Sequence, residues 1–322
     1  MNQNNKLITV VIPCYKVKNY VLDVINSIPD LVTKIICVDD KCPENSGKLI
    51  QDQCKDKRVL VLFNEKNLGV GGATLKGFKE ANKLQSDVIL KIDGDGQMDA
   101  KLISKFVKPI LENKADYTKG NRFTNYENLL KMPFIRLIGN IILTFLTKLS
   151  SGYWNIFDPT NGFICIHKKV FNMLPQEKLS SRFFFESDML FRLYLIKAKI
   201  IDIPINTIYN DSKSNLVIYK IVIPFLYGNI KNFLKRIIIE YFMINFNYIS
   251  IYLISSFFFI FTGYKIGIQS LALSSETGIP TVSGTIGLTI ILILIGFQLF
   301  INFINYDIRN YPKEPIKDKS LN

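Results

Sequence analysis

The sequence predicts an α/β domain built on a mainly parallel sheet, followed by a juxtamembrane amphipathic helix and two transmembrane helices. Two observations predict the sheet domain. Short apolar runs alternate with segments of helical spacing between residues 7 and 212, and several of the apolar runs end in acidic or proline-containing turns. A third observation predicts the membrane part, because two long uncharged segments lie close together near the end of the chain.

Four apolar runs near the start have the composition of buried parallel strands, at residues 7–12, 34–38, 59–63 and 88–92. Apolar residues at helical spacing predict helices between them, at residues 19–28, 46–54 and 67–84. After Asp99 the alternation is less regular, with helices expected at 102–111, 135–149 and 183–197 and strands at 117–122, 163–166 and 200–205. This alternation indicates a parallel sheet with helices on both faces.

The composition limits the classes of function. The 322-residue chain has a formal net charge of +13 and 48% hydrophobic residues, a combination that favours an anionic membrane surface over nucleic acid as the partner. The five cysteines show no C-x-x-C spacing, which indicates reduced thiols without a structural zinc or disulfide framework. His167 is the only histidine, and we interpret it as a solvated surface residue. The first residues contain no apolar run of the signal-peptide type, so the sheet domain is expected in the cytoplasm.

The C-terminal part has the pattern of a membrane hairpin. Residues 226–238 place apolar side chains on one helical stripe and basic ones off it, which predicts an amphipathic helix in a headgroup layer. Two uncharged runs follow, at 248–264, extended back to residue 241, and at 284–305, and each is long enough to span a bilayer. Basic residues flank the pair, so the positive-inside rule places both termini of this integral membrane protein in the cytoplasm and the 265–283 loop outside.

These patterns divide the chain into four segments. The predicted division is a sheet domain at 1–212, an amphipathic segment at 213–240, a transmembrane hairpin at 241–305 and a cytoplasmic tail at 306–322. Two adjacent core helices of a soluble protein are the alternative to the hairpin, but a domain of this size does not need two charge-free helices of such length. A hairpin of this kind is also compatible with a homo-oligomer.

The stretch from residue 87 to 99 carries the strongest chemical signal. A predicted buried strand ends there in Asp93-Gly94-Asp95-Gly96-Gln97. In an extended chain the spacing of two places Asp93, Asp95 and Gln97 on one face. Oxygen ligands at the carboxyl end of a strand suit a hard divalent cation, Mg²⁺ or Mn²⁺, which would carry a diphosphate. The alternative is an acidic turn without a ligand.

Two further groups follow neighbouring strands. Pro13 and Tyr15 come after the first strand, and Asp39 and Asp40 end the second. The carboxyl ends of parallel strands meet at one edge of a sheet, where doubly wound domains bind ligands. Physically, Asp39 can accept hydrogen bonds from a base or a ribose, and the Asp93 group can hold a metal against a diphosphate.

Together, the segments 11–15, 38–40, 67–73 and 93–97 resemble the family 2 glycosyltransferases with a GT-A (Rossmann-like) fold. They are most similar to the dolichol-phosphate mannosyltransferase and polyprenyl-phosphate glucosyltransferase branch, over residues 7–212. The resemblance implies inverting transfer of a sugar from a nucleotide-sugar to a polyprenyl phosphate, undecaprenyl or dolichyl phosphate, as in the synthesis of cell envelope glycans.

The resemblance also implies roles for individual residues. Those implied to bind the nucleotide-sugar are Pro13, Tyr15, Asp39, Asp40, Gly71 and Asp93. Those implied to hold the metal are Asp93, Asp95 and Gln97. The catalytic group would comprise Asp95, Arg122 in the family's Gly-x-Arg, Arg136 as a second phosphate contact, Asp158 next to the acceptor, and Asp188. A lipid phosphate is already a charged nucleophile, so the lack of a catalytic histidine is no objection.

Some positions depart from the family pattern, and other functions remain open. Lys16-Val17 stands where the branch has Asn-Glu, and Asn161 replaces a serine. With a sugar hydroxyl of a lipid-linked glycan as acceptor, Asp188 would be the general base. A processive polysaccharide synthase is disfavoured because no Gln-x-x-Arg-Trp element surrounds Trp154. A phosphatase using an aspartyl phosphate, a dinucleotide-binding protein, and a transporter or scaffold module with a degenerate enzyme domain are weaker alternatives.

Overall fold

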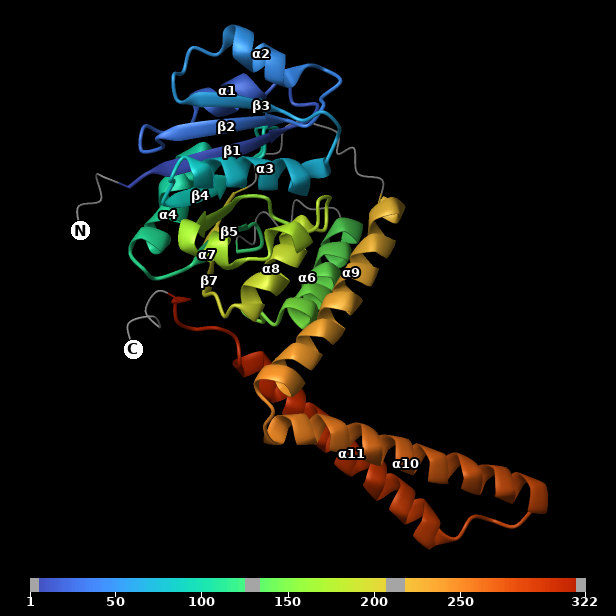
Figure 1. Cartoon of the computed structure of the whole chain (residues 1–322). Helices are drawn as coiled ribbons and strands as arrows, with labels where there is room; N and C mark the ends of the chain where they lie inside the picture. Colours follow the sequence, from blue (N-terminus) through green and yellow to red (C-terminus); the bar gives the residue numbers. More distant parts are fainter. Residues whose placement is uncertain (1–5, 125–133, 207–217, 317–322) are drawn as a thin grey trace. The chain divides into compact units, whose positions relative to one another are not determined.

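The computed structural model describes residues 6–124, 134–206 and 218–316 of the chain (Figure 1). Its internal contacts form two compact units. The first, here called the sheet unit, comprises residues 1–233 and 312–322, and the second, the hairpin unit, comprises 234–311. The boundary between them falls inside α9 (Ile218–Ile238), so the predicted amphipathic segment contributes residues to both units.

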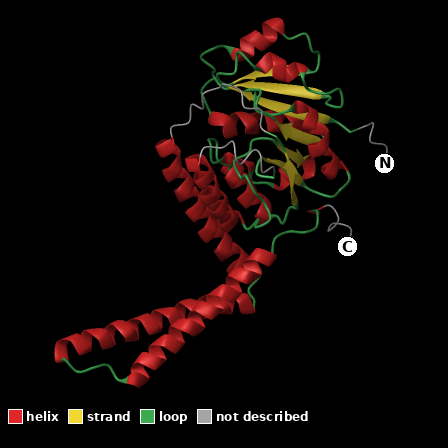
Figure 2. Ribbon diagram, turned by 180° about the vertical axis from the view of Figure 1, so that it is seen from behind, coloured by secondary structure: helices red, strands yellow, loops and turns green. Residues whose placement is uncertain are grey.

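A seven-stranded sheet in the order β3-β2-β1-β4-β6-β5-β7 forms the centre of the sheet unit (Figure 2). The strands are β1 (Ile8–Cys14), β2 (Lys34–Asp39), β3 (Val59–Phe63), β4 (Val88–Lys91), β5 (Tyr117–Asn121), β6 (Ile164–His167) and β7 (Ile200–Pro204). The first four are mutually parallel, β6 runs antiparallel to β4 and β5, and β5 pairs in parallel with β7. The predicted mainly parallel α/β fold is therefore confirmed, with one reversed strand inside it.

Helices cover both faces of this sheet. They are α1 (Val21–Asn26), α2 (Ser46–Gln53), α3 (Gly69–Lys83), α4 (Ile103–Leu111), α6 (Phe134–Ser151), α7 (Lys168–Met173) and α8 (Phe185–Leu195). Helices α1 and α4 bury apolar residues against the face presented by Ile8, Val10 and Ile12. On the opposite face α3 approaches β1 so closely that a Cβ at Gly77 would lie 2.3 Å from Val11. Both faces of the central strands are thus buried, which explains their continuous apolar runs.

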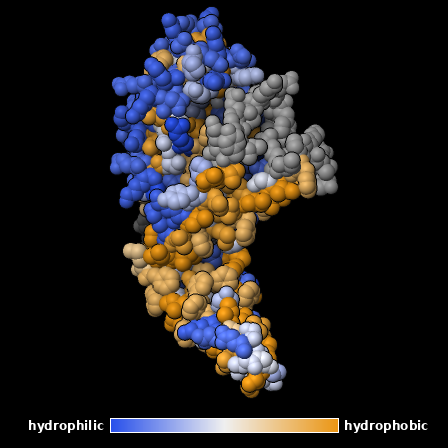
Figure 3. Space-filling model, turned by 90° about the vertical axis from the view of Figure 1, so that its right-hand side faces the viewer, coloured by the Kyte–Doolittle hydropathy of each residue, from blue (hydrophilic) through white to orange (hydrophobic). Residues whose placement is uncertain are grey.

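The hairpin unit consists mainly of α10 (Tyr248–Thr277) and α11 (Ser283–Arg309). Both are long and apolar enough to cross a membrane, with mean hydropathies of 1.5 and 2.3 in their most apolar windows. Apolar residues cover most of the hairpin surface visible in Figure 3. Such a surface is expected of helices that face lipid.

The boundaries of the two helices differ from those of the two predicted uncharged runs. The first does not extend back to Tyr241, because residues 239–244 form a short π-helix and Asn247 caps a new helix through a capping box with Ser250. At its other end the helix continues through most of the predicted loop and stops at Gly278, whose φ of 67° is left-handed. Only residues 278–282 separate the two helices.

Candidate active site

The sheet brings the predicted strand-end groups to one edge. In the register of β1 with its two neighbours, Cys14 pairs with Asp39 and Val11 with Lys91. The carboxyl ends of β1, β2 and β4 therefore lie side by side, as ligand sites of doubly wound sheets do. Pro13 is part of β1, and Tyr15, just beyond it, keeps 45% of its surface exposed. A flat exposed ring at this edge is available to stack on a ligand.

The carboxylates of Asp39 and Asp40 organise the loops at this edge. Asp39 accepts hydrogen bonds from the backbone N–H groups of Cys42 at 2.8 Å and Gly47 at 2.7 Å, and so holds the start of α2. Asp40 accepts from the backbone N–H groups of Leu68 and Gly69, both at 2.8 Å, at the start of α3. Both carboxylates lie at helix N-termini, where negative charge is favourable. Any contact that they make with a nucleotide would be in addition to these bonds.

The acidic turn after β4 holds two carboxylates of like charge. Asp95 Oδ1 accepts a hydrogen bond from the backbone N–H of Gln97 at 3.1 Å, and Gly96 closes the turn with a φ of 75°. Burial raises the pKa of Asp95, and the nearby charge of Asp93 raises it further. Repulsion of this kind is relieved when a cation binds between the carboxylates.

The donor set of this turn fits a divalent cation that is shared with a substrate. Among the described residues no group of three or more His, Cys, Asp or Glu side chains is arranged to hold a metal. Asp93 and Asp95 supply two hard oxygen donors, and the Gln97 amide can supply a third. Magnesium is usually bound in this way, by one or two carboxylates together with phosphate oxygens and water. The site therefore suits Mg²⁺ or Mn²⁺ carried by a diphosphate better than a metal held by the protein alone.

A buried lysine beside this turn was not predicted from the sequence. Lys91 Nζ lies 2.8 Å from Asp93 Oδ1 and 3.0 Å from Glu186 Oε1, and Lys91 is 1% exposed. Burial opposes the charge of Lys91, but the two carboxylates outweigh it and raise its pKa. For Glu186 burial is the stronger effect, and it raises the pKa of this carboxyl despite the attraction of Lys91. The lysine thus joins the acidic turn to the start of α8.

Arg122 is locked in place by Asp158. Its guanidinium donates to both oxygens of the carboxylate, from Nε at 2.7 Å and from an Nη at 2.6 Å. Burial favours the neutral form of Asp158, but the hydrogen bonds and charge of Arg122 prevail and lower its pKa. Asn161 donates to the same carboxylate and accepts from the backbone N–H of Phe163, so the asparagine that departs from the family pattern closes this turn.

A second buried lysine supports β5, the strand that ends just before Arg122. Lys119 on β5 is 1% exposed and donates to the carbonyl oxygens of Gly120 and Phe157 and to Asp202 on β7. Asp202 also accepts from Asn121 at 2.9 Å. Lysines in otherwise buried strands are rare unless they are paired, and this is the signal by which Lys91 and Lys119 could have been found in the sequence.

The remaining predicted residues lie in different settings. Asp188 accepts from the backbone N–H of Ser180, from Arg192 and from Asn232, and so ties a loop and two helices together. A Cβ at Gly71 would lie 2.6 Å from the Ser180 carbonyl oxygen, so close packing of the same loop requires this glycine. Arg136 belongs to α6, but its side chain is outside the described residues.

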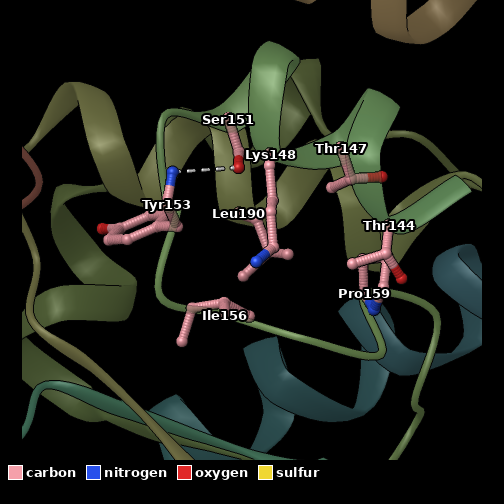
Figure 4. A pocket seen from close by; sticks show the side chains of 8 residues that line it. All are labelled: Thr144, Thr147, Lys148, Ser151, Tyr153, Ile156, Pro159 and Leu190. Atoms are coloured by element: carbon pink, nitrogen blue, oxygen red, sulfur yellow. Dashed lines mark hydrogen bonds between the residues drawn. The ribbon is translucent and has the colours of Figure 1, made fainter. Parts of the chain in front are cut away.

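A small pocket borders the Asp158 turn through Pro159 (Figure 4). Its other walls come from α6, from residues 153–156 and from Leu190 on α8. Lys148 points into it in Figure 4. The Nζ atom of Lys148 lies 3.6 Å from the centre of the Phe157 ring and donates to the Trp154 carbonyl oxygen, and burial lowers its pKa. None of the residues that line this pocket belongs to the acidic turn, so it is separate from the proposed metal site.

Comparison with known proteins identifies relatives of this chain. The profile of the family described as glycosyl transferase family 2 matches residues 9–174. A UDP-N-acetylglucosamine–dolichyl-phosphate N-acetylglucosaminyltransferase of Methanococcus voltae is 30% identical over 221 residues, which are 64% of this chain and 88% of that protein. An undecaprenyl-phosphate mannosyltransferase of Micrococcus luteus is 22% identical over 55% of this chain and 72% of its own length.

Solved structures give the same fold. Glucosyl-3-phosphoglycerate synthase of Mycobacterium tuberculosis, in complex with Mn²⁺, uridine diphosphate and glucosyl-3-phosphoglycerate, superposes with a TM-score of 0.50 at 16% identity. The match covers 72% of this chain and 80% of that one. At this identity the likeness shows the fold alone.

Proposed function

Because the chain belongs to glycosyl transferase family 2, we propose that it transfers a sugar, with inversion, from a nucleotide-sugar to a polyprenyl phosphate such as undecaprenyl or dolichyl phosphate. The named relatives from Methanococcus voltae and Micrococcus luteus, which use dolichyl and undecaprenyl phosphate, support this acceptor class. The nucleotide and the sugar are left open by the proposal.

The observation that carries the proposal is an apolar surface on the sheet unit itself. Helix α6 leaves a row of large side chains exposed, at Phe134, Ile138, Ile141, Ile142 and Phe145. Helix α9 lies alongside it in Figures 1 and 2 and is joined to it by a hydrogen bond from Ser150 to Asn229. A soluble donor and a soluble acceptor need no such surface, whereas an acceptor with a lipid tail has to be taken from a membrane.

The orientation of α9 strengthens this argument. Part of its predicted apolar stripe is exposed, with Leu226 and Ile230 at 42% and 49%, whereas Ile237 at the end of the stripe is buried. Asn229 and Asn232, off the stripe, face the sheet unit and are buried. A helix packed on a soluble domain would show the opposite arrangement. We therefore place α6 and α9 in the headgroup layer on the cytoplasmic side, with the α10–α11 hairpin in the bilayer and both termini in the cytoplasm.

The chemistry follows from the residues at the sheet edge. A divalent cation on Asp93, Asp95 and Gln97 would neutralise the departing nucleoside diphosphate. Tyr15, which is exposed at the same edge of the sheet, would contact the nucleotide. A phosphate acceptor is already ionised, so it needs orientation and charge compensation more than a base. In this proposal Arg122, whose guanidinium is held in one orientation by Asp158, would orient the phosphate.

The runner-up is transfer to a sugar hydroxyl of a lipid-linked glycan, with Asp188 as general base. Asp188 accepts three hydrogen bonds, two from side chains and one from a backbone N–H, which favours a role in holding the fold. A base also needs to lie within reach of the acceptor hydroxyl. The same acidic turn would serve either reaction, so the two proposals are distinguished by which acceptor receives the sugar.

The test is a transfer assay with the full-length protein in liposomes. A panel of nucleotide-sugars with Mn²⁺ is offered with undecaprenyl phosphate, or with a lipid-linked glycan, and the lipid products are analysed by mass spectrometry. We expect a polyprenyl-phosphate monosaccharide from at least one donor, and about 100-fold less product or lower from the Asp95→Asn variant. Products formed only on the lipid-linked glycan would overturn the proposal in favour of the runner-up.

A further inference from the structure

The hairpin unit contains a cavity of about 450 Å³ where α10 begins and α11 ends. The first turns of α10 supply Tyr248 and Tyr252, and the last turns of α11 supply Asn302, Asn305, Tyr306 and Arg309. The cavity is thus lined by aromatic, amide and cationic groups at the end of two helices that are otherwise apolar. No function proposed above uses this cavity.

The residues of α11 that supply amide, phenol and guanidinium groups to the cavity form a single stripe. Positions 305, 306 and 309 lie three, four and seven residues after 302, and positions with this spacing share one face of a helix. The preceding part of α11, residues 284–301, carries no charged side chain. Because the stripe coincides with the cavity, its amide and guanidinium groups line the cavity wall and provide hydrogen-bond donors for an anion.

Arg309 is the one charged residue among those that line the cavity, and the buried carboxylate of Glu240 lies behind the lining residue Asn310, from which it accepts a hydrogen bond at 3.5 Å. Arg309 is exposed and forms no ion pair within the described part of the chain, and no aspartate or glutamate lines the cavity. The nearest acid along the helix, Asp307, is 3% exposed and is engaged elsewhere. Arg236 donates to both of its oxygens at 2.5 and 3.0 Å, and the Tyr241 hydroxyl donates at 2.6 Å. Its negative charge is therefore compensated and does not oppose an anion in the cavity.

The same buried cluster holds the cavity in shape. The ring of Tyr241 meets that of Tyr306 edge to face, with centroids 6.4 Å apart. Tyr306 in turn meets Tyr248 at 6.2 Å, and Tyr248 meets Tyr252 at 5.6 Å. A chain of aromatic contacts thus runs from the ion pair to the wall. A site that is already formed loses less entropy when it orders a ligand.

We propose that this cavity binds the headgroup of an anionic phospholipid of the cytoplasmic leaflet. The phosphate lies against the Arg309 guanidinium, the amides of Asn302 and Asn305 donate to its oxygens, and the tyrosines contact the glycerol and the first carbons of the acyl chains. Tyrosine rings are favoured at this depth of a bilayer, and cations there attract anionic lipids. The inference rests on the proposed insertion of the hairpin, and it concerns a bilayer lipid rather than the sugar acceptor.

The experiment measures lipid retention by the full-length protein with native mass spectrometry. Protein in detergent is mixed with phosphatidylglycerol or with phosphatidylcholine, and the fraction carrying lipid is compared. We expect preferential retention of phosphatidylglycerol. Arg309→Gln should lower this retention about five-fold, which corresponds to the attraction of one basic residue for an anionic surface. Arg309→Lys should keep most of it, and Lys265→Gln, on the exposed part of α10 away from the cavity, should leave it unchanged.

Several outcomes would overturn the inference. Equal losses in Arg309→Gln and Lys265→Gln would indicate only general attraction to charge, and equal retention of phosphatidylcholine would exclude an anionic ligand. Displacement of phosphatidylglycerol by an equimolar amount of undecaprenyl phosphate, dependent on Arg309, would assign the cavity to the acceptor instead.

The transfer assay on the same samples separates this inference from the proposed function. Arg309-dependent retention without any sugar transfer would leave the lipid site standing and remove the proposed function. Sugar transfer together with lipid retention that does not depend on Arg309 would support the proposed function and remove the lipid site.

Discussion

The ammonium group of Lys91 lies 3.0 Å from the carboxylate of Glu186, although the two residues are 95 positions apart in the chain. The same ammonium lies 2.8 Å from Asp93. One buried cation therefore pairs with a carboxylate of the acidic turn and with a carboxylate of α8. Through this contact the position of the proposed metal ligand depends on the packing of a helix from the second half of the sheet unit.

Replacing Lys91 with methionine should destabilise the protein markedly. The change leaves Asp93 and Glu186 close together without the cation between them, and loss of one partner of a buried ion pair costs about 3–5 kcal/mol. We expect a lower melting temperature, followed by the fluorescence of Trp154, the single tryptophan of the chain.

The control for this prediction is the double variant Lys91→Met with Glu186→Gln. It removes the cation together with the buried carboxylate that the cation compensates, so part of the lost stability should return. If the double variant melts at the temperature of Lys91→Met or lower, the charge balance described here is not what Lys91 provides.

Gly162 should not tolerate a side chain. A Cβ at this position would lie 2.4 Å from Lys91 Nζ and 2.5 Å from Asp93 Oδ2. Gly162→Ala should therefore displace Asp93 and reduce sugar transfer by about tenfold or more, since misplacement by about 1 Å can cost 100-fold in rate. The measurement is the initial rate of transfer at saturating donor.

Gly139 provides the matched control for this substitution. It lies in α6, and a Cβ there would meet no atom within 4 Å. Gly139→Ala should leave the rate unchanged and raise stability slightly, because alanine is the better helix former. Equal rates in the two alanine variants would contradict the close approach of Gly162 to the acidic turn.

Much of this architecture is predictable from local patterns. The apolar runs that became β1, β2 and β4 are buried on both faces and therefore carry continuous apolar sequence. The run of β3 is equally apolar, but it lies at the sheet edge and leaves Leu60 and Phe63 exposed. The resemblance to family 2 glycosyltransferases, read from the strand-end motifs, is confirmed by the family match over residues 9–174. These features could be predicted because each is encoded within a few consecutive residues.

Contacts between distant segments could not be predicted in this way. The pairing of Lys91 with Glu186, and that of Lys119 with Asp202, depends on which strands and helices become neighbours. The interpretation of His167 as a solvated residue is wrong, because it is 7% exposed and its Nδ1 accepts from the backbone N–H of Lys169 at the start of α7. A helix cap of this kind is a local contact, but its burial depends on the tertiary fold.

The ion pair of Arg122 with Asp158 should make stability depend on pH in the acid range. The pKa of Asp158 is lower in the folded protein than its ordinary value. Its contribution to stability is therefore complete above the ordinary aspartate pKa of about 3.9 and is lost as the pH falls through the lower folded value. The control variant is Asp158→Asn, which cannot ionise.

We expect the wild-type protein to melt at a higher temperature than Asp158→Asn at pH 7, with a difference in unfolding free energy of about 1.5–3 kcal/mol. The difference should shrink below about pH 4 as the carboxylate of the wild type takes up a proton. Trp154, four residues before Asp158, is close enough to report the melting of this turn. A difference that stays constant from pH 7 to pH 3 would exclude the charged pair as its origin.

Asp95 is the residue whose loss should separate binding of metal from folding. Its carboxylate is repelled by Asp93, so Asp95→Asn removes a metal ligand and at the same time relieves a like-charge contact. The variant should therefore fold as well as the wild type, while its affinity for Mn²⁺ in the presence of a nucleoside diphosphate falls about tenfold or more. Sugar transfer should fall by about 100-fold or more.

Free Mn²⁺ is measured by electron paramagnetic resonance, and the melting temperature is measured in the same samples. The control is Asp99→Asn, which removes a carboxylate four residues later that only caps a short helix. It should change neither the Mn²⁺ affinity nor the rate of sugar transfer by more than about twofold. Wild-type Mn²⁺ affinity in Asp95→Asn would remove the acidic turn from the metal site, whatever the effect on the rate.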